Sequence, residues 1–260
     1  MDAAMNGHET IFLRLGDNLR KLLAKTKQRP DIELWVSEIG RATHSVPADE
    51  QKQAEALVKA FTMCFAMDIK RVYWFEAKGP AYGKGGDFGL LRDDWSERPS
   101  YAAMRNITQL LGDDAKYAGW HDANGGKSYG FVFEGNGKPV LVTWATAAAG
   151  DKLRFASDVT VLDIEGEATK HPADQELSIT REPVFVTDLP ADLVAAARAN
   201  AGKPFPWLKD FSTADKVSVT MGTSNVESGI VQQDKGDGLT VVELIDGSHV
   251  RRTDKSKNKN

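Results

Sequence analysis

The chain has 260 residues, of which 41% are hydrophobic and 27% charged, and its formal net charge is -4 at pH 7. These values are ordinary for a soluble globular protein with one large domain or two medium ones. The small negative charge gives no electrostatic reason to expect nucleic acid or an anionic membrane as a partner. No apolar run reaches bilayer-spanning length, and the start MDAAMNGHET lacks the pattern of a secretory signal, so the compartment is left open.

The first 112 residues alternate between helical and strand patterns. We expect helices over 11–27, 48–67 and 99–111, and buried strands over 32–37 and 71–75. Pro47 precedes the second helix and Pro99 starts the third, where a missing backbone N–H costs nothing. The order helix, strand, helix, strand, helix implies parallel strands joined by crossover helices, which is an α/β arrangement.

After Gly112 the period of the pattern changes to short apolar runs separated by turn residues. Strands are expected over 128–133, 140–145, 152–155, 159–164, 176–179 and 184–186. Turn signals include Gly135-Asn136-Gly137, Gly150-Asp151 and Glu165-Gly166. This spacing is typical of an antiparallel sandwich or barrel. We therefore place a domain boundary between residues 112 and 117.

The remaining residues predict smaller elements. A connector helix and a short β segment are expected over 191–250, with strand-like runs at 216–221 and 239–244. The polar, basic tail 251–260 has no apolar partner and is expected to be disordered. The predicted organisation is thus 1–114, 115–190, 191–250 and 251–260.

Cysteine and histidine usage gives no support for a metal or redox centre. Cys64 is the only cysteine, so an intrachain disulfide and a thiolate metal cluster are both excluded. The five histidines are widely spaced and never lie three or four residues apart, which excludes a helical metal-binding pair. We expect no metal and no cofactor.

The first candidate for chemistry is Glu38, in the run IELWVSEIG that ends on Gly40. A charge at the carboxyl end of a buried parallel strand is costly unless the protein uses it. Two nearby look-alike motifs carry less weight. Asp87-Phe88-Gly89 matches a kinase tripeptide without the rest of that signature, and GPAYGK at 79–84 has the wrong spacing for a phosphate loop.

Three segments in this order resemble a known enzyme family: LWVSEIG at 34–40, RVYWFEAKG at 71–79 and DFGLLRDDWSERPSYAAMRNITQLL at 87–111. They are similar to the last third of a clan-A glycoside hydrolase, the (β/α)8-barrel superfamily that includes β-xylosidases, β-galactosidases and related endo-acting enzymes. There the seventh strand ends in W-x-[ST]-E-x-G, and a run FGLL…D…(K/R)P-x-Y-x-A leads into the eighth helix. The second run is matched by Phe88 to Leu91, Asp94, Arg98, Pro99, Tyr101 and Ala103.

The resemblance implies a carbohydrate substrate and a set of site residues. Glu38 takes the position of the nucleophile, and Trp74 that of the tryptophan that stacks on the sugar. Glu76 follows Trp74 on the same side by two-residue alternation. Arg41 and His44, in the loop after Glu38, are candidates for hydrogen bonds to sugar hydroxyls. Members of this superfamily are often secreted.

The expected fold class is α/β plus all-β: the last two βα units of a TIM-type barrel followed by an antiparallel β-sandwich. A complete barrel needs eight strand–helix units and about 250 residues. Only two units fit before Gly112. The superfamily's acid/base is the Glu of an Asn-Glu pair, and neither Asn18 nor Asn106 is followed by Glu. The sequence predicts a C-terminal glycoside hydrolase fragment, inactive alone, with an upstream barrel fragment as partner.

The alternative is a non-catalytic carbohydrate-binding or structural module built on the β-sandwich. Exposed aromatic side chains would then bind the sugar, and Trp120, Trp144 and Trp207 are the candidates.

Overall fold

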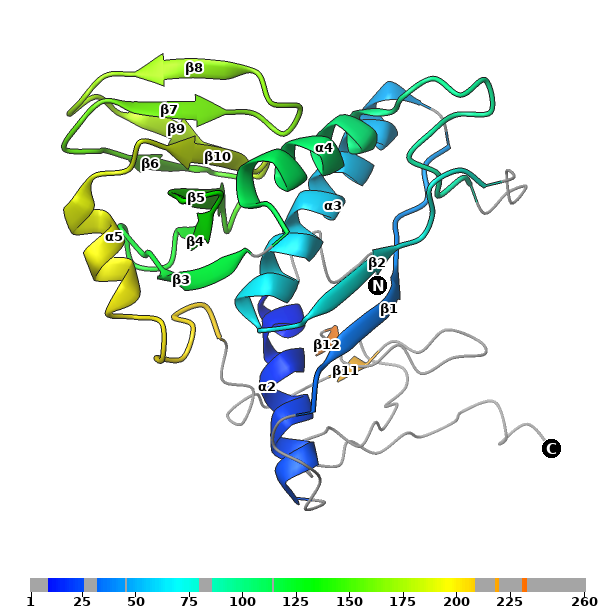
Figure 1. Cartoon of the computed structure of the whole chain (residues 1–260), viewed down its shortest axis with the longest axis horizontal. Helices are drawn as coiled ribbons and strands as arrows, with labels where there is room; N and C mark the ends of the chain where they lie inside the picture. The colour runs from blue at the N-terminus through cyan, green and yellow to red at the C-terminus, as the bar shows by residue number, and fades with distance from the viewer. Residues whose placement is uncertain are drawn as a thin grey trace. The chain divides into compact units, whose positions relative to one another are not determined.

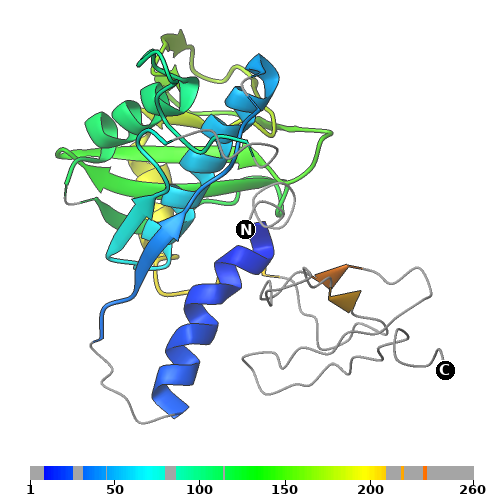
Figure 2. The ribbon, with the colours of Figure 1, turned by 90° about the vertical axis from the view of Figure 1, so that its right-hand side faces the viewer.

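The computed structural model describes residues 9–25, 32–44, 46–79, 86–113, 115–208, 218–219 and 231–232. The chain divides into two compact units, one formed mainly by residues 3–33 and 208–260 and the other by residues 34–207. The described part of the first unit contains helix α2 (Glu9–Lys25), a single uninterrupted helix in Figure 2, and the short antiparallel pair β11 (Ser218–Val219) and β12 (Val231–Gln232). The helix expected over 11–27 is thus confirmed, whereas 239–244 and 251–260 lie outside the described residues.

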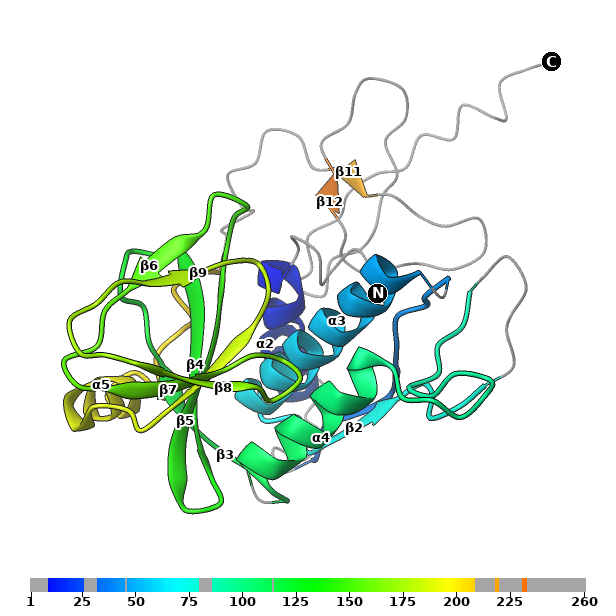
Figure 3. The same ribbon diagram turned by 90° about the horizontal axis from the view of Figure 1, so that it is seen from above.

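The second unit begins with a β–α–β crossover. Strands β1 (Trp35–Ile39) and β2 (Arg71–Trp74) pair in parallel and are connected through helix α3 (Pro47–Ala66), as predicted. Helix α4 (Pro99–Leu111) follows and packs beside α3 (Figure 3). Both helices start on a proline in the first turn. No described helix has the length and apolar character needed to cross a membrane.

The prediction that β1 and β2 are buried strands is wrong. Trp35 is 54% exposed and Tyr73 is 48% exposed, while their neighbours Val36 and Val72 are only partly covered. An apolar parallel strand is expected to be buried, because parallel sheets are usually covered on both faces by helices and flanked by further strands. The described sheet has two strands only, so it lacks that cover. The guanidinium of Arg71 lies over the ring of Trp35, 4.8 Å from its centroid.

The rest of the second unit is an antiparallel sheet of six strands, seen with helix α5 (Ala191–Arg198) in Figure 1. The strand order is β3 (Lys116–Trp120), β4 (Ser128–Gly135), β5 (Lys138–Ala145), β10 (Val184–Thr187), β7 (Val159–Leu162), β8 (Ala168–His171). A separate pair, β6 (Asp151–Leu153) and β9 (Leu177–Ile179), shares one apolar core with this sheet and α5 through Val132, Leu153, Ile179 and Ala197. The protein thus combines helices with a multi-stranded antiparallel sheet, and the division into a barrel segment and a complete sandwich stays a prediction.

Most of the expected strands occur, and one turn explains the register of the longest hairpin. Asn136 and Gly137 have φ angles of 46° and 76°, and Gly135 pairs with Lys138. Two central residues with positive φ form the tight turn that matches the twist of a hairpin. Strands β3 and β8 were not predicted.

The last turn of helix α4 packs closely against strand β4 of the antiparallel sheet. A Cβ added to Gly135 would lie 2.5 Å from the Cα of Leu111, so only glycine permits this approach. The domain boundary expected between residues 112 and 117 therefore falls inside one compact unit, and that boundary stays a prediction.

Candidate functional site

Glu38 and Trp74 are brought to the same end of two hydrogen-bonded parallel strands. Ile39, the residue after Glu38, is the register partner of Trp74, and the Phe75 amide donates to the Ile39 carbonyl at 2.8 Å. The pairing shifts register between Val36 and Ile39, at the residues on either side of Ser37 and Glu38. A register irregularity changes the direction of a side chain relative to simple alternation.

The expectation that Glu38 carries a costly charge at the end of a buried strand is wrong. Glu38 lies inside β1 and is exposed, so its charge carries no burial cost in this structure. Its candidacy therefore depends on its position at the end of the sheet where Trp74 also lies, and on the motif around it.

Gly40 allows the backbones that follow the two strands to approach each other. A Cβ added at Gly40 would lie 2.2 Å from the carbonyl oxygen of Phe75 and 3.2 Å from the ring of Phe88. The first distance is impossible for a real side chain, so the glycine is required by close packing.

Trp74 and Glu76 occupy different positions relative to the sheet. Trp74 is half-buried at the last position of β2, and its indole Nε1 is buried with no hydrogen-bond partner among the described residues. Glu76 lies beyond β2, so the strand alternation does not extend to it. Its backbone pairs with the later loop: the Glu76 amide donates to Phe88 and its carbonyl accepts from Leu90 at 3.0 Å.

Arg41 and His44 are brought together by Asp49, in the first turn of α3. The Asp49 carboxylate accepts from the His44 amide at 2.8 Å and contacts the His44 ring at 3.2 Å, and it pairs with Arg41 at 3.6 Å. The bond from the His44 amide is the main reason that the pKa of Asp49 is lowered. Arg41 is buried and His44 exposed, so these two predicted binding residues differ in what they can reach.

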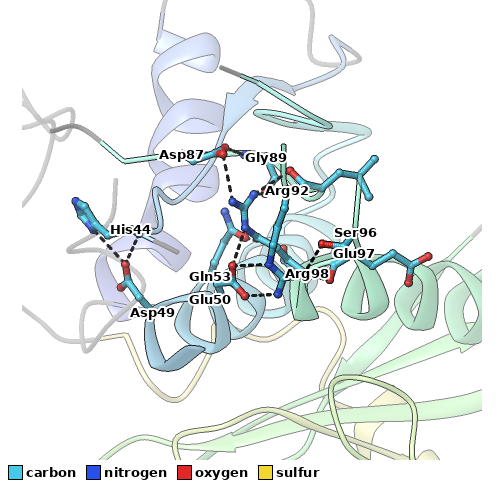
Figure 4. A network of polar contacts seen from close by, with 12 residues as sticks. His44, Asp49, Glu50, Gln53, Asp87, Gly89, Arg92, Ser96, Glu97 and Arg98 are labelled. Carbon is cyan, nitrogen blue, oxygen red and sulfur yellow. Dashed lines mark hydrogen bonds and ion pairs between the residues drawn. The ribbon is translucent and has the colours of Figure 1, made fainter. Parts of the chain in front are cut away.

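This unit also contains a buried polar network that the sequence did not predict (Figure 4). Its centre is Arg98, with a side chain only 1% exposed. Arg98 Nε donates to Glu50 Oε1 at 3.0 Å, and Nη1 donates to the carbonyls of Gly89 and Leu91 at 2.7 and 2.9 Å. Nη2 reaches Asp87 Oδ2 at 3.2 Å.

Glu50 in α3 also binds a second arginine of the loop. Arg92 Nε donates to Glu50 Oε1 at 3.0 Å, and Arg92 Nη2 pairs with Oε2. Burial raises the pKa of Glu50, but the bonds from Arg92 and Arg98 outweigh it, so that the pKa is lowered overall. This network holds residues 87–98, which lead into α4, against α3, and it gives a structural role to Asp87 and to the arginine of the R-P-S-Y run.

The loops after β1 and β2 are joined by further bonds. Thr43 and Asp87 exchange both of their backbone hydrogen bonds at 2.8 Å. Gln53 Nε2 donates to the carbonyls of Arg41 and Phe88 at 2.9 and 3.3 Å, and Ser100 Oγ donates to Gln53 Oε1. Residues 41–43 and residues 87–88 are therefore held together directly and through Gln53.

Two other kinds of site find little support in the described residues. They contain no group of three or more histidine, cysteine or acidic side chains that could hold a metal ion. The tryptophans proposed for a sugar-binding sandwich are mostly interior: Trp144 is 0% and Trp207 is 6% exposed, and Trp120 is half-buried. Trp207 packs against Phe131 and Tyr129 at ring-centroid distances of 5.2 Å.

Comparison with known proteins gives a likeness at the level of fold. No protein-family model matches the chain, and neither does any curated protein. Among solved structures, a family 39 glycoside hydrolase from Bacteroides cellulosilyticus WH2 superposes with a TM-score of 0.54 and 21% identity, over 66% of this chain and 37% of that one.

Two further solved structures have TM-scores too low to add to this likeness. A GH30 endoxylanase from Clostridium papyrosolvens C71 has a TM-score of 0.45 and 12% identity, over 65% of this chain and 45% of that one. The family 30 xylanase Xyn30A from Clostridium acetobutylicum has a TM-score of 0.43 and 17% identity, over 64% and 44%. This chain thus spans less than half the length of these solved structures. The likeness to the family 39 enzyme shows a glycoside-hydrolase-like fold over about two thirds of the chain.

Proposed function

We propose that this chain is part of a retaining glycoside hydrolase, with Glu38 as the nucleophile and Trp74 as the side chain on which the sugar stacks. The observation that carries the proposal is the register of β1 and β2, in which the residue after Glu38 is paired with Trp74. The glycoside-hydrolase-like fold supports the same function at a coarser level.

In a retaining glycosidase the two carboxyl groups stand about 5–5.5 Å apart. One attacks the anomeric carbon and forms a glycosyl ester, while the other protonates the leaving oxygen and later activates water. Glu38 is exposed and is assigned the first role. We assign the second to a glutamate on a polypeptide outside residues 1–260, which supplies the other barrel strands. The apolar surface at Trp35 and Tyr73 is where further strands and helices would be expected to cover the sheet.

The purified chain alone should not hydrolyse aryl β-xylosides or β-galactosides. Mixed or fused with the first six βα units of a family 39 enzyme, it should gain hydrolysis, and Glu38→Gln in the same assembly should abolish it. Added azide should restore turnover to Glu38→Ala and give a glycosyl azide of inverted configuration, because azide replaces the missing nucleophile.

Glu33→Gln is the matched control, since this exposed glutamate precedes β1. Hydrolysis by the chain alone that is lost in Glu38→Gln would show that the acid/base lies within residues 1–260. An assembly that remains equally active with Glu38→Gln would exclude Glu38 as the nucleophile.

A further inference from the structure

A tight hairpin over residues 91–97 presents a tryptophan to solvent. Trp95 is 69% exposed, the largest exposed fraction among the large hydrophobic side chains of the described residues. Its φ angle is 68°, a left-handed conformation that bulky residues rarely adopt. Glycine or asparagine is the usual residue at such a position, so the choice of tryptophan calls for a reason beyond the turn itself.

The hairpin is held by backbone hydrogen bonds within it and by a side-chain contact to α3. Leu91 and Glu97 form an antiparallel bridge, and the Arg92 amide donates to the Ser96 carbonyl at 2.9 Å. The Trp95 amide donates to the Arg92 carbonyl at 2.9 Å. The Arg92 side chain then connects the hairpin to the buried Glu50 in α3, as Figure 4 shows. The indole is therefore presented by a fixed backbone.

Polar groups of both signs lie beside the indole. Lys78 Nζ lies over the Trp95 ring, 4.8 Å from its centroid, and it is 3.9 Å from Asp93 Oδ1. Because this ammonium covers one face of the indole, a sugar would stack on the opposite face of this exposed side chain. An aromatic face offers apolar contact to the C–H groups of a pyranose, while an ammonium and a carboxylate donate to and accept from its hydroxyls.

The hairpin is attached to the end of β2 at which Trp74 lies. The Leu90 amide donates to the Glu76 carbonyl and the Leu91 amide to the Ala77 carbonyl, both at 3.0 Å. The segment that begins after Trp74 is thus bound directly to the base of the hairpin.

We propose that Trp95 is a second stacking platform for a neutral glycan, with Lys78 and Asp93 as hydrogen-bonding partners; this rests on the proposed function. The local charge favours a neutral ligand. The hairpin carries three carboxylates, Asp93, Asp94 and Glu97, and the neighbouring cations are paired: Lys78 with Asp93, Arg105 with Glu97 and Arg92 with Glu50. Carboxylates repel phosphate groups, so a nucleic acid, the other common ligand of exposed aromatics, is disfavoured.

The test uses the full chain in native affinity electrophoresis with soluble β-1,4-xylan, β-1,4-galactan and β-1,3-glucan, followed by calorimetry with the hexasaccharide of the polymer that retards it. Trp95→Gly removes the ring and suits the positive φ angle, so the hairpin can keep its shape. Trp95→Phe keeps a smaller aromatic face. Trp35→Ala is the control, because it removes an exposed tryptophan at the opposite end of β1.

We expect Trp95→Gly to weaken hexasaccharide binding about three- to tenfold, which corresponds to the loss of one aromatic contact. Trp95→Phe should weaken it less, and Trp35→Ala should leave it unchanged. Equal binding by wild type and Trp95→Gly would overturn the assignment of Trp95 as a stacking platform. If Trp74→Ala abolishes binding in that case, the proposed function of the Glu38 site is still supported. Wild type that binds none of the three glycans also overturns the platform, because all its groups lie within this chain. Retardation by single-stranded DNA instead would assign the indole to a different ligand.

Discussion

Arg98 and Glu50 form an ion pair in the interior of the larger unit, with Arg98 Nε 3.0 Å from Glu50 Oε1 and side chains that are 1% and 5% exposed. The pair joins α3 to the residue that precedes α4, and Arg98 also binds the loop carbonyls of Gly89 and Leu91. The buried charge of Arg98 is tolerated because each of its three guanidinium nitrogens donates to an acceptor.

Glu50→Gln should therefore destabilise the protein strongly. The substitution leaves Arg98 buried with less compensating charge, and breaking a buried pair in this way costs about 3–5 kcal/mol. Urea unfolding followed by circular dichroism measures the change. Glu97→Gln is the matched control, because its ion pair with Arg105 is about half exposed and should change stability by less than about 1 kcal/mol. Equal stability of the two variants would show that the buried pair contributes little.

Gly40→Ala tests the close approach behind Glu38. The added methyl would overlap the Phe75 carbonyl oxygen, so the segments after β1 and β2 must separate. We expect a loss of about 1–3 kcal/mol, the usual cost of overpacking. Gly202→Ala provides the control, since a Cβ there meets nothing within 4 Å. A thermal midpoint of Gly40→Ala equal to that of Gly202→Ala would contradict this packing.

Glu182→Gln should stabilise the protein at neutral pH. Glu182 is half-buried, and this desolvation, followed by the charges of Glu55 and Asp163, raises its pKa above 4.5 despite a bond from Gln51. A raised carboxyl pKa favours folding below the unfolded value and disfavours it as pH rises through the folded value. The variant should have a higher thermal midpoint than wild type at pH 7, and the gain should disappear near pH 4.

The amide of glutamine still accepts the bond from Gln51, so the comparison isolates the charge. Glu167→Gln removes an exposed carboxylate and should give no such pH-dependent gain. A gain for Glu182→Gln that is equal at both pH values would point to packing instead of ionisation.

Cys64 should react with thiol reagents only when the protein unfolds. It is buried in α3, and burial raises the pKa of its thiol to about 12, so that almost no thiolate exists at pH 8. Labelling by Ellman's reagent in increasing denaturant should follow the loss of helical circular dichroism. Complete labelling of the native chain within minutes would show that α3 opens locally.

The local signals in the sequence predicted the elements well. Proline placed the starts of α3 and α4, and Asn136-Gly137 placed the β4–β5 turn, because each depends on backbone conformation within a few residues. Strand β3 was missed because Gly119 interrupts its apolar pattern. Strand β8 was missed because it is a polar strand at the edge of its sheet.

The long-range features could not be predicted in the same way. The burial of β1 and β2 depends on neighbouring strands, which a residue pattern does not reveal. The partners Glu50 and Arg98 are 48 positions apart, so no spacing rule connects them. In the candidate site, the pairing next to Glu38 and Trp74 agrees with what the family resemblance implies, whereas the roles of Glu38, Trp74, Glu76, Arg41 and His44 in sugar binding stay predictions.

The two reciprocal backbone hydrogen bonds between Thr43 and Asp87 close a hydrogen-bonded ring that connects the segment after β1 with the segment after β2. Neither amide can exchange its hydrogen with solvent unless that ring opens, so the two should exchange at similar rates and as one cooperative event. A displacement of the segment after Glu38 at Thr43 should therefore move the backbone at Asp87 with it, so that two segments 44 positions apart in the sequence respond as a single unit.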